Sequence, residues 1–110
     1  MTTRTLRFIE DPGHGWLEVP VADLVKLGIE NEITPYSYKS RDGKLAYLEE
    51  DCDLSTYARA KGYTVGMHKW SEPVERVYQE NTHIRSLPSY SPPMPRDAWS
   101  GIADAMRGAA

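Results

Sequence analysis

The 110-residue sequence has a single cysteine, no long apolar run and no excess of basic residues. Because Cys52 has no partner for an internal disulfide, we expect a cytosolic setting. No stretch approaches the roughly 18 apolar residues of a membrane span, and the first residues do not resemble a signal peptide. With 13 basic and 16 acidic side chains, the net charge of −3 disfavours a general nucleic-acid binder.

The remaining composition is that of an ordinary soluble domain, with 40% hydrophobic and 26% charged residues. A chain of this length forms one domain with one modest core. Its charge is uneven, because residues 1–53 hold 11 acidic and 6 basic groups, whereas residues 54–110 hold 5 and 7. The first half of the chain is therefore the acidic half.

The first third of the sequence predicts two strands and a helix. Thr5–Glu10 alternates as a strand does and stops at the turn-forming run Asp11–Gly15. Trp16–Val19 predicts a second strand. A proline then suits the start of a helix over Val21–Leu27, which we expect to end at Gly28.

A hairpin is the clearest local signal. Asp42–Gly43 separates the runs Tyr36–Ser40 and Leu45–Glu49, as is typical of a two-residue turn. This register places Tyr38 opposite Tyr47, and a cross-strand aromatic pair contributes about 0.2–1 kcal/mol of stabilisation.

Four carboxylates precede a second predicted helix, Leu54–Lys61, which ends at Gly62. This acidic cluster consists of Glu49, Glu50, Asp51 and Asp53. We expect Asp51 or Asp53 to cap the helix. The functional alternatives are coordination of a divalent cation and a negative surface for a basic partner. The spacing of a calcium loop is absent, which favours the partner surface. The thiol of Cys52 is expected to be inert, since neighbouring negative charge disfavours the thiolate.

The second half of the chain is less regular. Tyr63–Trp70 predicts a strand, Ser71–Thr82 fits either a helical face or a loop, and His83–Leu87 predicts a last short strand. Four of the eight prolines fall within residues 88–95, which favours an extended arm. The short amphipathic segment after it carries three apolar residues that either dock on a partner, dock on the domain itself, or belong to a disordered tail. They are Trp99, Ile102 and Met106.

These elements predict an α+β fold, with a mainly antiparallel sheet of four or five strands and two helices. The compact domain is expected over residues 1–87 and the proline-rich C-terminal arm over residues 88–110.

The run DPGHG at the end of a strand resembles the start of the zinc-dependent N-acetylmuramoyl-L-alanine amidases. The resemblance implies a zinc site built from one histidine, a glutamate and a second histidine. The matching residues are His14, Glu30 or Glu32, and His68 or His83. The match covers five residues, all of turn-forming type, and that family's fold is larger than this chain. A turn is therefore the preferred interpretation, and a minimal zinc hydrolase is the second hypothesis.

A longer pattern, DPGHGWLEVP followed by YSY and AYLEEDCD, runs roughly from Thr5 to Gly62. It resembles a family of small uncharacterised proteins encoded by bacteriophages and prophages. The resemblance implies a phage or prophage origin and a bacterial cytoplasm, and it assigns no activity and no catalytic residue.

The aromatic residues of the hairpin suggest a third hypothesis, weak binding of single-stranded nucleic acid, because bases stack on aromatic rings. The platform would consist of Tyr36, Tyr38 and Tyr47 beside Lys39, Arg41 and Lys44. The interleaved glycine and aromatic pattern of an RNA-recognition strand is missing.

The preferred interpretation is a non-enzymatic interaction module, without cofactor or metal, that binds another macromolecule. The expected partner is a host or phage protein, or a second copy through the arm; neither a membrane nor nucleic acid is expected. The candidate partner-binding residues are Glu49, Glu50, Asp51, Asp53, Tyr36, Tyr38, Tyr47, Trp99, Ile102 and Met106.

Overall fold

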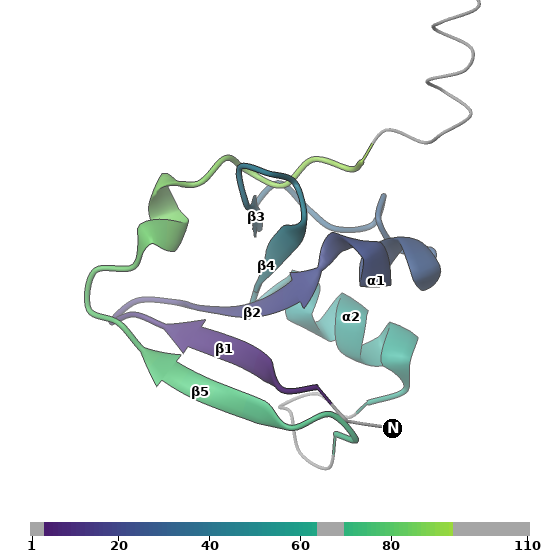
Figure 1. Ribbon diagram of the computed structural model, residues 1–110, viewed down its shortest axis with the longest axis horizontal. Coiled ribbons are helices and arrows are strands. Elements are labelled where there is room, and N and C mark those ends of the chain that lie inside the picture. The colour runs from purple at the N-terminus through teal and green to yellow at the C-terminus, as the bar shows by residue number, and fades with distance from the viewer. Residues whose placement is uncertain (1–3, 64–69, 94–110) are drawn as a thin grey trace, which may run out of the picture.

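The computed structural model describes residues 4–63 and 70–93, which form one five-stranded sheet with two α-helices on one side (Figure 1). In this part of the chain the elements are β1 (Leu6–Glu10), β2 (Gly15–Pro20), α1 (Val21–Lys26), β3 (Tyr38–Lys39), β4 (Leu45–Glu49), α2 (Asp53–Lys61), β5 (Val74–Tyr78) and the 3-10 helix η1 (His83–Ser86). The strand order is β3-β4-β2-β1-β5, and each pair is antiparallel except β1 with β5. The predicted α+β fold with a mainly antiparallel sheet is confirmed.

The first two strands and both helices form where the local pattern predicts them. Leu6 and Phe8 on β1 face the same core as Leu17 on β2. Helix α1 ends before Gly28 and α2 at Gly62, and both glycines have a positive φ, of 71° and 74°. Glycine suits these positions because a side chain strains the left-handed conformation.

The β3–β4 hairpin has the predicted register, with Tyr38 paired to Tyr47. Its turn begins one residue earlier than predicted, because the backbone N–H of Gly43 donates to the Ser40 carbonyl at 2.9 Å. Arg41 and Asp42 are therefore the central residues of the turn, instead of Asp42 and Gly43.

The centre of the ambiguous stretch Ser71–Thr82 is a strand, which neither alternative predicted: β5 pairs in parallel with β1 along its full length. The residues on either side of β5 form loops. Backbone hydrogen bonds fix both ends of this pairing: Leu6 N–H donates to Pro73 O at 2.9 Å, and Gln79 N–H donates to Glu10 O at 2.8 Å. The predicted strand His83–Leu87 is also wrong. Most of it is the 3-10 helix η1, whose Ile84 side chain is buried.

The predicted domain boundary at Leu87 falls inside ordered structure. Pro88 O accepts a hydrogen bond from Lys39 N–H at 3.0 Å, and Tyr90 N–H donates to Ser37 O at 2.7 Å. Tyr90 is 3% exposed, and its hydroxyl donates to Glu30 O at 2.6 Å. This segment covers the outer edge of β3, which would otherwise offer unpaired backbone groups.

The two faces of the sheet carry separate apolar clusters. The larger cluster lies between the sheet and the two α-helices and includes residues of both. Its buried members are Leu6, Phe8, Leu17, Val19, Val21, Leu24, Ile29, Ile33, Ala46, Leu48, Leu54, Tyr57 and Tyr90. The other face has a smaller cluster under η1, composed of Ile9, Trp16, Tyr47 and Ile84. In Figure 1, η1 lies on the opposite side of the sheet from the two α-helices.

Among residues 4–63 and 70–93, no helix has the length and apolarity needed to cross a membrane. The predicted strand Tyr63–Trp70 lies almost entirely outside the described residues, as does the amphipathic segment of the C-terminal arm.

Candidate functional site

A pocket of about 340 Å³ opens at the sheet face that carries the smaller cluster. We call it the aromatic pocket. Its lining residues come from the β1–β2 loop, the loop between α1 and β3, the strands β2 to β4, the turn before α2, and η1. They are His14, Trp16, Tyr36, Tyr38, Glu49, Asp51, Cys52 and Arg85.

One wall of the aromatic pocket is a stack of rings and a guanidinium. The Trp16 and Tyr38 rings meet edge to face, with centroids 6.2 Å apart. Arg85 lies over the Trp16 ring at 5.3 Å from its centroid, within the range of a cation–π contact. Trp16 itself is 1% exposed, and its indole N–H is buried without a hydrogen-bond partner among the described residues.

The Asp11 carboxylate organises the loop that carries His14. It accepts hydrogen bonds from the backbone N–H groups of Gly13 at 2.9 Å and His14 at 2.8 Å, and from Arg85 Nε at 2.6 Å. The Arg85 guanidinium, helped by the two backbone N–H groups, lowers the pKa of Asp11 well below its ordinary value. The DPGHG run is therefore a turn, as preferred from sequence, and it fixes His14 and Arg85 beside each other at the pocket.

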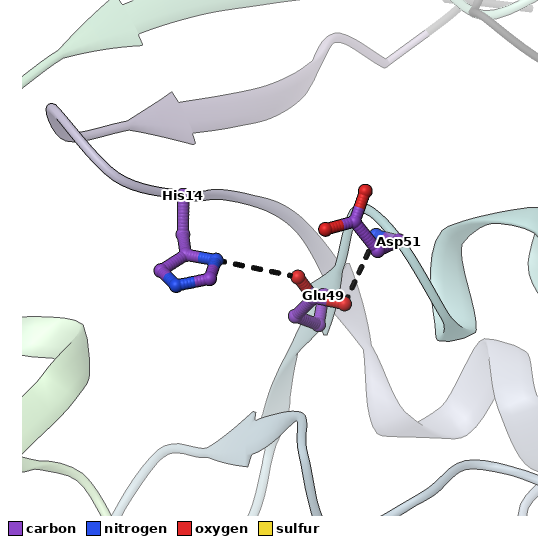
Figure 2. Close-up of side chains that lie close together, drawn as sticks. All are labelled: His14, Glu49 and Asp51. Atoms are coloured by element: carbon purple, nitrogen blue, oxygen red, sulfur yellow. Dashed lines mark hydrogen bonds and ion pairs between the residues drawn. The ribbon is translucent and has the colours of Figure 1, made fainter.

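His14 lies opposite the carboxylates of Glu49 and Asp51, at the C-terminal end of β4 (Figure 2). Its Nδ1 is 3.5 Å from Glu49 Oε1. The other oxygen of Glu49 accepts a hydrogen bond from the backbone N–H of Asp51 at 2.9 Å. One ligand-type atom from each of His14, Glu49 and Asp51 can be chosen so that all three lie within 4.8 Å of one another.

Asp53 does not cap α2, in contrast to the prediction, and neither does Asp51: the residue at the cap position is Cys52, which makes no side-chain capping bond. The Asp53 side chain instead turns inward, where it is 1% exposed. Its carboxylate accepts hydrogen bonds from Thr34 N–H at 3.1 Å, Thr34 Oγ1 at 2.8 Å and the Ser37 hydroxyl. A buried carboxylate that binds three donors of its own chain is not a partner-binding surface, so this part of the prediction is wrong.

The Asp53 hydrogen bonds fix the loop that presents Tyr36. Thr34 and Ser37 flank this tyrosine, and Ser37 N–H also donates to Thr34 O at 3.2 Å. Tyr36 is 73% exposed at the rim of the aromatic pocket. A large aromatic side chain is thus held in water by a rigid loop.

The remaining carboxylate of the acidic cluster, Glu50, and the neighbouring Cys52 lie in different surroundings. Glu50 does not line the aromatic pocket and borders a smaller hollow beside Asp11 and Tyr78. Desolvation and then the charges of Asp51 and Glu49 raise the pKa of Glu50. Desolvation and the Glu49 carboxylate also raise the pKa of the Cys52 thiol, the direction expected for an inert thiol.

The predicted stacking platform on the hairpin does not form. Tyr47 is 5% exposed, and its ring meets His83 edge to face at a centroid distance of 6.3 Å. The basic residues beside it are directed to the chain itself: Lys39 donates to Ser91 and Arg41 to Ser86 O. Tyr47 is therefore a core residue and not a partner-binding one.

The amidase-like ligand set is not brought together in the described residues either. Glu30 and Glu32 lie in the loop after α1, outside the group that His14 forms with Glu49 and Asp51. His83 lies on η1 and does not line the aromatic pocket. His68, Trp99, Ile102 and Met106 lie outside the described residues.

Sequence reasoning missed Trp16 and Arg85 as site residues, because an apolar strand residue and a lone arginine carry no local signal of function. No protein-family model, curated protein or solved structure matches this chain. The resemblance to phage and prophage proteins therefore stays a prediction.

Proposed function

We propose that the protein is a non-enzymatic interaction module that binds a protein partner through the aromatic pocket. The observation that carries this proposal is the meeting of Trp16, Tyr36, Tyr38 and Arg85 at one hollow of about 340 Å³. Tryptophan, tyrosine and arginine are the residues that dominate binding energy at protein interfaces. The volume is at the lower end of the range for ligand pockets, which suits one large partner side chain.

The rigidity of the pocket supports the same function. The Asp53 network holds the Tyr36 loop, and the Asp11–Arg85 pair holds the opposite wall. A rigid site loses little conformational entropy when it binds, so more of the contact energy is available as affinity. The sequence resemblance supports a phage or prophage accessory role in the bacterial cytoplasm for this module.

The test is to pan a library of random displayed peptides against the immobilised full chain. Enriched peptides should bind Tyr36→Ala at least about tenfold more weakly than the wild type, because truncating an aromatic residue that contacts the partner closely costs about 2 kcal/mol or more. Tyr78→Ala is the matched control, since Tyr78 is 62% exposed on β5 and does not line the pocket. Failure to enrich any sequence, or equal binding to Tyr36→Ala, would contradict the proposal.

A zinc-dependent hydrolase is the second candidate function, and the observation that favours it is the position of His14 beside two carboxylates. Its metal ligands would be Glu49 and Asp51 in place of the glutamate and histidine implied by the amidase resemblance. Incubation of the zinc-supplemented chain with peptidoglycan, followed by mass spectrometry, tests it. Amide cleavage that disappears in His14→Ala would overturn the non-enzymatic proposal.

A further inference from the structure

We propose that His14, Glu49 and Asp51 form a binding site for a divalent transition metal ion, with zinc as the best match. This inference goes beyond partner binding and does not depend on it.

The sheet register brings the three residues together. Trp16 on β2 pairs with Glu49 on β4, and Glu50 N–H donates to Gly15 O at 3.0 Å. The loop that ends in His14 therefore lies beside the residues that follow β4. Because Asp11 also binds the His14 backbone N–H, the histidine position is fixed from both sides.

The spacing fits a shared ion better than it fits a direct contact. Two ligand atoms bound about 2.0–2.1 Å from a tetrahedral zinc ion stand roughly 3.3–3.4 Å apart. His14 Nδ1 and Glu49 Oε1 are 3.5 Å apart, which is longer than an ordinary N–H···O hydrogen bond. The exposed Asp51 side chain has one carboxylate oxygen within 4.8 Å of a ligand atom of each of the other two residues.

Glu49 is the independent observation that points to a cation. It is only 8% exposed, yet it lines the aromatic pocket. In the described part of the chain, its carboxylate contacts His14 and accepts a hydrogen bond from the Asp51 backbone N–H, and no lysine or arginine pairs with it. Burying a carboxylate is costly unless a positive charge compensates it, and a bound metal ion would supply that charge.

The ligand types select the metal. Imidazole nitrogen with carboxylate oxygen suits zinc and similar transition ions, whereas magnesium and calcium prefer oxygen ligands throughout. Three protein ligands leave one position of a tetrahedral ion open toward the pocket. Figure 2 shows the His14 ring and the carboxylates of Glu49 and Asp51 around the space that the metal ion would occupy.

The experiment titrates the metal-free full chain with zinc chloride alone, by calorimetry and by native mass spectrometry. One zinc ion per chain is expected, and His14→Ala should weaken binding by roughly tenfold or more, since loss of an outer-shell partner alone costs that much. Asp51→Asn should weaken it similarly. Because Asp51 is exposed, Asp51→Asn tests the site without replacing the buried Glu49, a change that could unfold the chain.

One control separates this site from surface binding. His83→Ala should bind zinc as the wild type does, because His83 is exposed on η1 and outside the group. Because the titration uses zinc chloride alone and no peptide, failure of the partner proposal and failure of the metal proposal are distinguishable. No bound zinc, or unchanged affinity in both His14→Ala and Asp51→Asn, would overturn the inference.

Discussion

The face of the sheet under α1 and α2 buries thirteen residues of one apolar cluster, whereas the opposite face buries four. Two helices and the segment around Tyr90 cover the first face, but on the second face the described chain supplies only the short helix η1. The aromatic pocket lies where this second cover stops. Trp16 and Tyr38 belong to the smaller cluster and also line the pocket.

This difference separates a face packed for stability from a face that carries the proposed binding site. The filled face holds apolar side chains that are buried against one another, so their role is to stabilise the fold. On the other face, large rings and charged groups line a hollow that the described residues leave open. Polar groups that remain near water beside aromatic rings are the usual composition of a binding site.

The largest expected effect is on the filled face. Leu17→Ala removes a side chain that is 0% exposed and should lower the free energy of unfolding by about 2–5 kcal/mol, through lost burial and a residual cavity. Leu45→Ala, on the partly covered face, should cost less than half as much because this leucine is only partly buried. Urea unfolding of both variants measures the difference. Equal losses would mean that the two faces are equally well packed.

A smaller effect is expected from the carboxylate that holds the Tyr36 loop. Asp53→Ala leaves the donors of Thr34 and Ser37 without their acceptor and should cost about 1–3 kcal/mol. Asp51→Ala is the matched control: it removes an exposed carboxylate from the same acidic run and should change stability by less than about 0.5 kcal/mol. Thermal unfolding of the two variants tests this contrast, and similar losses would contradict the assigned role of Asp53.

The smallest effect concerns the pocket wall and depends on pH. Because Arg85 lowers the folded-state pKa of Asp11, the pair stabilises the fold above the unfolded value of about 3.9 and loses this effect as pH falls toward the folded value. Asp11→Asn should therefore cost about 1 kcal/mol at pH 7, a modest figure because the Arg85 side chain is 48% exposed.

The difference between the wild type and Asp11→Asn should shrink below about pH 4. Urea unfolding at several pH values measures it, with Glu32→Gln as the control for an exposed carboxylate. A difference that stays constant down to pH 2 would show that the ion pair is not its cause.

Most of the local elements could be predicted from the sequence. Three local signals agree with the structure. They are the alternation of Leu6 and Phe8 in β1, the helical spacing after Pro20 in α1, and the glycines at the ends of both helices. The hairpin register follows from two short runs that face each other across a turn. Each of these features depends on residues close together in the chain.

The candidate site was only partly predictable. His14, Tyr36 and the acidic run drew attention for separate hypotheses, as an amidase-like ligand, a stacking residue and a negative patch. Their residue types indicated chemistry, but not which of them would share one pocket. Asp53 is an example. Its position at the start of a helix favours a helix cap, but its carboxylate instead accepts hydrogen bonds from Thr34 and Ser37, which are nineteen and sixteen residues earlier in the chain.

The sequence by itself determined the strands, helices and turns whose signals are local, because backbone preferences and apolar periodicity act over a few residues. Only the tertiary structure decided that β5 joins β1 in parallel, that Tyr90 closes the edge of β3, and that Arg85 lies on Trp16. Such pairings join residues about 50 to 70 positions apart, where loop-closure entropy changes too slowly with length to select a partner. The selection comes from which surfaces bury the most apolar area together, and that becomes defined only when the whole sheet has assembled.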